Sequence, residues 1–158
     1  MLEQYRISDF IEWSKAKKLK LNPDFQRGSV WSPPARVFLI DTILRGLPIP
    51  KIYLRTTTDI ETMTSIRDVV DGQQRLRAIL DFSENKFRLT NRANEFANLT
   101  YDNMPQELKE NFLGYPLAVE QLVNADEDFI LEIFSRLNSY TVTLNPAEKR
   151  HAKYQGRF

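Results

Sequence analysis

The sequence contains no cysteine and a single histidine, His151. Without cysteine the chain cannot form a disulfide, a thiolate zinc site or a cysteine nucleophile. One histidine cannot build a multi-histidine metal site. Although a histidine can act as a general base, His151 on its own is more typical of a structural or surface position.

Long apolar runs and an excess of either charge are also lacking. No segment approaches the ~20 consecutive apolar residues that a membrane span needs, and residues 1–4 lack the charged and then apolar order of a signal peptide. The 22 basic and 21 acidic residues nearly balance, which leaves nucleic-acid binding open because a basic patch can lie on a neutral protein. We expect a cytoplasmic protein with no membrane association, and 158 residues suit one domain spanning 1–158.

Several active-site motifs are missing as well. There is no G-x-x-x-x-G-K-[ST] segment, no G-x-G-x-x-G after a predicted strand and no G-x-S-x-G. These absences exclude a P-loop, the usual dinucleotide-binding turn and the nucleophile elbow of the α/β-hydrolases. Any nucleotide site in this chain must therefore be built in another way.

Helical and strand-like patterns are mixed along the chain, which predicts an α+β domain with a small mixed sheet flanked by helices. We expect helices over Ser8–Ala16, from Pro33 to a stop at Gly46, after Gly72, over Pro105–Phe112 and over Asp126–Asn138. We expect strands over Lys51–Arg55, Ile66–Val70, Lys86–Thr90 and Leu117–Val123, an extended segment over Leu19–Phe25 and a polar hairpin loop over Thr56–Ser65. A further helix start at Asn145–Glu148 indicates the N-terminal part of a longer protein.

The strongest local signal is the segment from Asp71 to Arg75, which reads Asp-Gly-Gln-Gln-Arg. An apolar strand ends at a carboxylate, Gly72 makes a turn, and a helix begins with two amides and a guanidinium. Unpaired backbone N–H groups and the positive end of a helix dipole attract phosphate, and Asp71 is a suitable oxygen ligand for Mg²⁺. The alternative is a tight turn in which Arg75 pairs with Asp71 for structure alone.

Two further clusters carry polar residues at the ends of predicted elements. Gln26 and Arg27 precede Trp31, and Arg27 can offer a two-pronged guanidinium to a phosphate. Arg136 and Asn138 end the last predicted amphipathic helix, and residues two apart do not share a helix face. Either that helix unwinds there, or Arg136 is an exposed arginine and Asn138 a C-terminal cap.

Together these clusters resemble one family, the N-terminal domain of GmrSD-type, modification-dependent restriction systems. The resemblance covers residues 5–155 and rests on three ordered motifs, which are Phe25–Arg27 with Trp31 and Arg45–Pro50, then Asp71–Arg75, then Phe134–Asn138 with Leu144–Glu148. One departure is the turn over residues 139–143, Ser-Tyr-Thr-Val-Thr, where the family usually has a glycine.

The resemblance implies a compact fold similar to the ParB and sulfiredoxin group, with nucleoside triphosphate binding and hydrolysis in a system that restricts foreign DNA. It implies catalytic roles for Asp71, Gln74 and Arg75, with Asp71 also holding Mg²⁺. The nucleotide-binding residues that it implies are Gln26, Arg27, Gly72, Gln73, Arg136 and Asn138. Sulfiredoxin's own chemistry does not carry over, because it needs a cysteine, and the family's nuclease module is expected on another domain or subunit.

Two other functions remain open from the residues. A DNA-binding module of the ParB type would place basic side chains on the phosphate backbone, and the candidates are Arg6, Lys15, Lys17, Lys18 and Lys20. A metal-dependent nuclease would use the Asp71 carboxylate, although few acidic residues lie near it in the sequence.

Overall fold

The computed structural model describes residues 1–21, 31–90, 95–122 and 126–142. These residues form five strands and five helices. The strands are β1 (Leu2–Arg6), β2 (Leu19–Lys20), β3 (Ile52–Asp59), β4 (Thr64–Asp71) and β5 (Pro116–Gln121). The helices are α1 (Ile7–Lys15), α2 (Pro33–Leu44), α3 (Gln73–Ser83), α4 (Gln106–Leu113) and α5 (Glu127–Val142).

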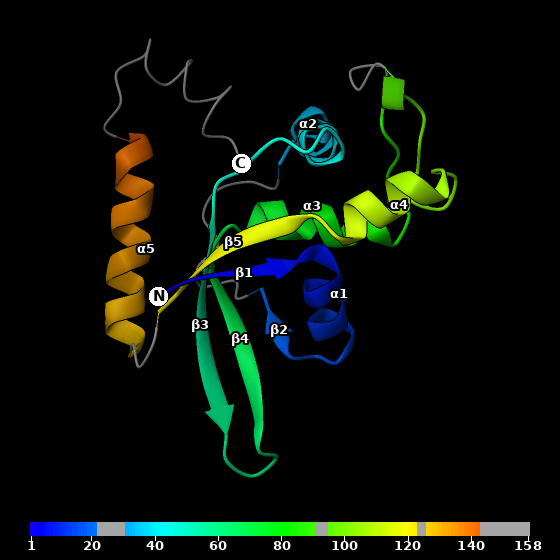
Figure 1. The fold of residues 1–158 in the computed structure, drawn as a ribbon. Helices are drawn as coiled ribbons and strands as arrows, with labels where there is room; N and C mark the ends of the chain where they lie inside the picture. The colour runs from blue at the N-terminus through cyan, green and yellow to red at the C-terminus, as the bar shows by residue number, and fades with distance from the viewer. Residues whose placement is uncertain (22–30, 91–94, 123–125, 143–158) are drawn as a thin grey trace.

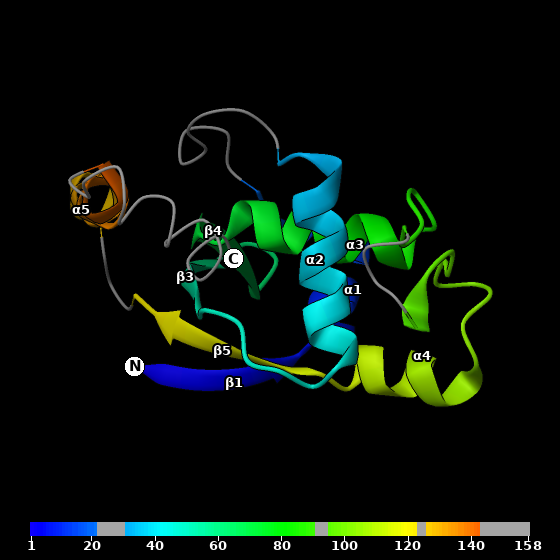
Figure 2. The same cartoon turned by 90° about the horizontal axis from the view of Figure 1, so that it is seen from above.

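The five strands form one mixed sheet in the order β1-β5-β3-β4-β2. β5 runs antiparallel to β1 and parallel to β3, β3 runs antiparallel to β4, and β2 runs parallel to β4. Helices α1 to α4 gather around one part of the sheet, while α5 stands apart from them (Figures 1 and 2). The predicted α+β class and the mixed sheet flanked by helices are confirmed.

Different helices cover the two faces of the sheet. Successive side chains of a strand point to opposite faces, so each strand contributes to both. Val69 points into the main core, which also contains the fully buried Leu76 of α3 and Leu39 of α2. Its neighbour Val70 points to the other face and packs with Ile130 and Phe134 of α5. The β4 strand, buried on both faces near its end, therefore connects the two layers.

Several sequence-based boundaries need correction. The first helix begins at Ile7 with Arg6 as N-cap rather than Ser8, because the Asp9 carboxylate accepts from the Arg6 backbone N–H at 2.9 Å. It follows directly on β1, a strand that the sequence analysis did not predict. Residues 86–90 are not a strand. Phe129 belongs to the apolar pattern of the helix expected over Asp126–Asn138, a pattern that predicts a buried side chain, but it is 51% exposed.

The predicted loop over Thr56–Ser65 is also too long. β3 continues to Asp59 and β4 begins at Thr64, so that only residues 60–63 form the turn. The polar threonines hid this hairpin from a hydrophobic pattern, yet threonine is a good strand former because it is β-branched. Among the residues described, no helix has the length and apolar character needed to cross a membrane.

The end of α2 shows why a glycine is needed at position 46. Gly46 has φ +71°. Its N–H donates to the Ile43 carbonyl at 2.9 Å, and the N–H of Leu47 donates to the Thr42 carbonyl at 3.1 Å. This is the Schellman arrangement, which ends a helix with a left-handed residue. A Cβ at Gly46 would meet no atom within 4 Å, so only the backbone conformation requires glycine here.

We predict that Gly46→Ala lowers the free energy of unfolding by about 1 kcal/mol, the usual cost of a left-handed alanine. Gly46→Asn should cost less, because asparagine tolerates this conformation better. Chemical denaturation of the three proteins checks the order. Equal stability of all three would contradict the Schellman explanation.

Candidate functional site

The candidate site is the corner at which β4 ends and α3 begins. Asp71 is the last residue of β4, and Gly72 is the N-cap of α3 with φ +100°. A Cβ at Gly72 would lie 2.5 Å from Ile52 Cδ1 and 3.0 Å from Arg75 Nη2. Both the conformation and the space around it therefore require glycine, and the helix starts immediately after the strand's carboxylate.

The N-terminus of α3 points its first backbone N–H groups out of the helix at this corner. Among the described residues no side chain caps this end, and the first backbone bond within the helix runs from Leu76 N–H to Gly72 C=O at 3.0 Å. The side chain of Asp71 beside it is 33% exposed. A helix start of this kind favours anions, and the nearby carboxylate can bind a cation that accompanies them.

Arg75 is buried below the corner rather than spread over its surface. Its guanidinium donates to the Lys51 carbonyl at 2.9 Å and lies 3.5 Å from the Asp71 carboxylate. Burial lowers the pKa of Arg75 from its ordinary value, while the charge of Asp71 opposes that shift. The pairing of Arg75 with Asp71 is thus present, and Arg75 holds both Asp71 and the start of β3 in position.

The two glutamines of the motif have different surroundings. Gln73 is 5% exposed, and its Nε2 donates to the Val69 carbonyl at 3.1 Å, back along β4. Gln74 points the other way, and its Oε1 accepts from the Trp31 backbone N–H at 3.2 Å. Gln73 therefore fastens the corner, whereas Gln74 fastens the chain that follows residues 22–30.

The described residues that flank the segment 22–30, Leu21 and Trp31, both lie near this corner. β2 runs parallel to β4, with Lys20 opposite Asp68, so the chain up to Leu21 heads toward the end of β4 where Asp71 lies. The chain is described again at Trp31, on Gln74. Gln26 and Arg27 themselves lie outside the described residues, and their contact with the corner stays a prediction.

Arg136 and Asn138 both belong to α5, which continues to Val142. The helix does not unwind after Arg136, and the interpretation of Asn138 as a C-terminal cap is wrong. Arg136 is 73% exposed at its side chain and pairs with Glu132 at 3.1 Å. Phe134, two residues earlier, packs on Val70, so Arg136 faces away from the sheet. The Asn138 side chain lies outside the described part of the protein.

Tyr53 is a residue that the sequence analysis missed. In the β3–β4 ladder it lies opposite Asp71, at a register shift between Tyr53 and Leu54. A tyrosine in an alternating strand is an ordinary half-buried residue, and only the pairing of β3 with β4 shows that it borders the site.

Asp71 is the one carboxylate that the described residues place at this corner for the predicted Mg²⁺. No group of three or more histidine, cysteine, aspartate or glutamate side chains that could hold a metal occurs among the described residues. Mg²⁺ is commonly bound by one or two carboxylates together with water and substrate phosphates. Asp71 alone therefore fits an ion that arrives with a nucleotide, and does not fit a metal held by the protein alone.

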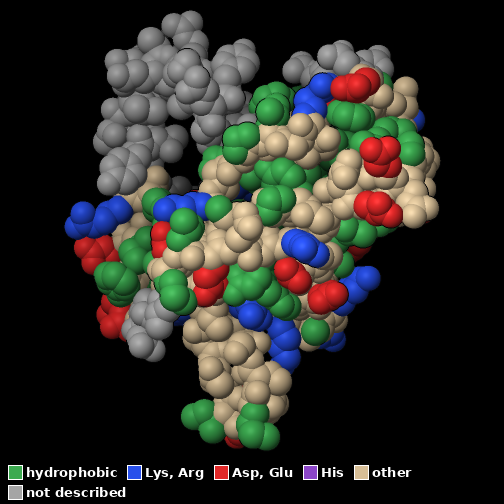
Figure 3. All heavy atoms as spheres, in the orientation of Figure 1, with side chains coloured by type: hydrophobic (Ala, Val, Ile, Leu, Met, Phe, Trp, Pro, Cys, Tyr) green, Lys and Arg blue, Asp and Glu red, His purple; other side chains and the backbone are tan. Residues whose placement is uncertain are grey.

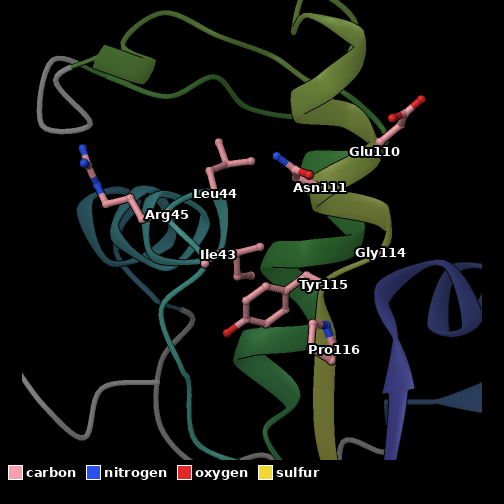
Figure 4. A pocket seen from close by; sticks show the side chains of 9 residues that line it. Ile43, Leu44, Arg45, Glu110, Asn111, Gly114, Tyr115 and Pro116 are labelled. Carbon is pink, nitrogen blue, oxygen red and sulfur yellow. The ribbon is translucent and has the colours of Figure 1, made fainter.

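Two hollows lie elsewhere on the described surface. The one shown in Figure 4, of about 400 Å³, lies between the end of α2 and the α4–β5 connection. Its cation, Arg45, already pairs with Asp41 at 3.0 Å and with Glu95 at 2.9 Å. The other, of about 410 Å³, lies between α1, the end of α3 and α4, and includes Lys15, Glu12 and Glu84. Neither contains residues of the predicted site.

These features define an α+β domain with a strand–glycine–helix corner suited to anions. The chain belongs to the family of GmrSD restriction endonuclease N-terminal domains, whose model matches residues 7–155. This confirms the resemblance seen in the sequence and an association with DNA restriction systems. No curated protein matched the sequence.

One solved structure with a similar chain path is the C-terminally truncated chromosome-partitioning protein ParB from Caulobacter crescentus, complexed with CTP-gamma-S. The identity is 17% and the TM-score 0.48, and the similarity covers 92% of this chain. The chain spans 56% of the length of that ParB chain.

We predict that Gly72→Ala destabilises the protein more than Gly46→Ala, by roughly 2–4 kcal/mol, because it adds overpacking to the strain of positive φ. The alanine Cβ would have to displace Ile52 and the Arg75 guanidinium. Thermal unfolding of the two variants side by side checks this. If the two losses of stability are equal, the corner is not tightly packed around Gly72.

Proposed function

We propose that the β4–α3 corner binds a nucleoside triphosphate and hydrolyses it, and that this reaction regulates a DNA restriction system. The observation that carries the proposal is the start of α3, which no described side chain caps and which lies directly beside the partly exposed Asp71 carboxylate. This combination offers N–H donors for phosphate oxygens and an oxygen ligand for a divalent cation.

Each residue of the corner then has a separate role. The backbone N–H groups of the first turn of α3 bind phosphate oxygens, which places the phosphate at the start of the helix, beside Asp71. Arg75, buried and bonded to Lys51, is a positioning residue that orients Asp71. Gln74 keeps the chain at Trp31 against α3. Gln26 and Arg27 precede Trp31 in the sequence and supply further groups for the phosphates in this proposal.

Hydrolysis of a phosphoanhydride needs mainly positioning and charge stabilisation, because no covalent intermediate on the protein is required. Asp71 can orient the attacking water or hold Mg²⁺. When bound, Mg²⁺ neutralises charge on the phosphate oxygens. Arg27 would add a positive charge to that of Mg²⁺. Such a charge stabilises the transition state of phosphoryl transfer.

The test measures binding of ATP, GTP, CTP and UTP by calorimetry with and without Mg²⁺, together with phosphate release. We expect Asp71→Asn to lower the thermal unfolding temperature, because it removes the charge that pairs with the buried Arg75. At a temperature where the variant is fully folded, it should lose the Mg²⁺-dependent part of the affinity and reduce turnover by about 100-fold or more. Asp102→Asn is the matched control, because Asp102 is an exposed carboxylate distant in sequence from the corner.

Arg27→Ala should weaken nucleotide binding, because it removes a positive charge from the proposed phosphate site. Arg75→Ala should instead lower stability as well as binding, because Arg75 is buried and holds Lys51 and Asp71. Wild-type hydrolysis by the Asp71→Asn protein would refute the proposed role of the carboxylate. Failure of all four nucleotides to bind would refute the proposal as a whole.

A further inference from the structure

The β3–β4 hairpin extends beyond the rest of the sheet. β5 pairs with β3 only over Ile52–Leu54, and β2 pairs with β4 only at Arg67 and Asp68. Residues 57–66, here called the arm, have no strand partner among the described residues except one another. Figure 1 shows the arm projecting from the body of the molecule.

The tip of the arm exposes two large apolar side chains. Ile60 is 87% and Met63 is 86% exposed, more than any other large hydrophobic residue described. Figure 3 shows hydrophobic side chains at the free end of the projection. Single exposed apolar residues are common on proteins, but here two of them occupy one four-residue turn.

Met63 is also held in an unfavourable backbone conformation. Its φ is +56°, a value at which glycine or asparagine is usual and a longer side chain is strained. The turn itself is well defined, because the Asp59 carboxylate accepts from the backbone N–H groups of Glu61 and Thr62 at 3.0 and 3.3 Å. The turn therefore holds the exposed Met63 side chain at the tip on a defined backbone.

The charge of the arm excludes one kind of partner and favours another. Residues 57–66 contain Asp59 and Glu61 and no basic residue. A tip with two carboxylates and no cation is repelled by nucleic-acid phosphates. It suits a protein surface that combines apolar contact area with positive charge.

Such a surface exists at the root of the arm in the same chain. The end of α1 and β2 carry the exposed Lys15, Lys17 and Lys20, and Lys18 donates to Thr64 of the arm at 2.9 Å. Trp13 and Leu19, close to these lysines in the sequence, are partly buried against the core, and the Arg67 guanidinium lies over the Trp13 ring at 3.8 Å from its centroid. We call this surface the lysine corner. One chain thus has an acidic, apolar tip and a basic, partly apolar root at opposite ends of one projection.

We propose that two copies of this chain associate through a two-fold axis, with the tip of each arm docked on the lysine corner of the other copy. A two-fold interface requires a surface that is complementary to itself. Two arms laid antiparallel meet this requirement, because each tip then reaches the other root. The contact buries Ile60 and Met63 and brings Glu61 close to Lys17 and Lys20. This inference does not depend on nucleotide binding.

The first test is sedimentation equilibrium of the 158-residue chain over a wide range of concentrations. We expect a concentration-dependent dimer that weakens as salt is added, since charged contacts contribute. Met63→Gly should weaken the dimer by about tenfold or more, as loss of an interface anchor does, while the thermal unfolding temperature of the monomer stays the same or rises because the strain at φ +56° is removed. Leu131→Ala, at an exposed apolar residue of α5, is the matched control and should leave the dimer unchanged.

The second test exchanges the charges. Glu61→Lys alone and Lys17→Glu with Lys20→Glu should each weaken the dimer, and the protein carrying all three changes should regain it. A chain that stays monomeric at every concentration overturns the proposal, as does a dimer that the tip and charge variants leave unchanged. If the tip variants reduce binding of a DNA duplex by a monomeric protein, the arm is a nucleic-acid element and the proposal is wrong.

Discussion

The corner at Gly72 is the constraint on which the rest of this structure depends. Its positive φ allows the chain to turn from β4 directly into α3, and its missing Cβ leaves the space that Ile52 and Arg75 occupy. The same turn therefore sets the direction of a central helix, the packing of the neighbouring strand and the place of a buried cation. A side chain at this position would disturb all three at once, because its Cβ would lie 2.5 Å from Ile52 Cδ1 and 3.0 Å from Arg75 Nη2.

A buried arginine is costly unless it is paired, since desolvation disfavours the charge. Arg75 is paired by a carbonyl on one side and by Asp71 on the other, and these two contacts join β3 to the end of β4. The carboxylate keeps its outer part exposed, so that it can both support the fold and meet a ligand. Structure and proposed function thus share one pair of residues, rather than competing for them.

Membership in the GmrSD N-terminal family and the geometry of the corner bear on different parts of the proposed function. The family associates the chain with DNA restriction, and the corner presents uncapped backbone N–H groups beside a carboxylate, without a P-loop. The lysine corner lies on a different part of the fold, at the root of the arm. A regulatory domain with one surface for a ligand and another for self-association would let the two be changed separately by mutation.

Much of this fold can be predicted from the sequence, because the residues that begin and end its helices and strands act locally. Pro33 at a helix start, Gly46 at a helix end and the carboxylate–glycine step at Asp71 each act through neighbouring residues, so the α+β class and the strand–glycine–helix turn at Asp71–Arg75 follow without a structure. The burial of Arg75, the different partners of Gln73 and Gln74, the place of Tyr53 and the exposed tip of the arm depend on which strands pair and in which register. Those pairings join residues far apart in the chain, and only the tertiary structure decides them, because no local pattern records which strand lies next to which.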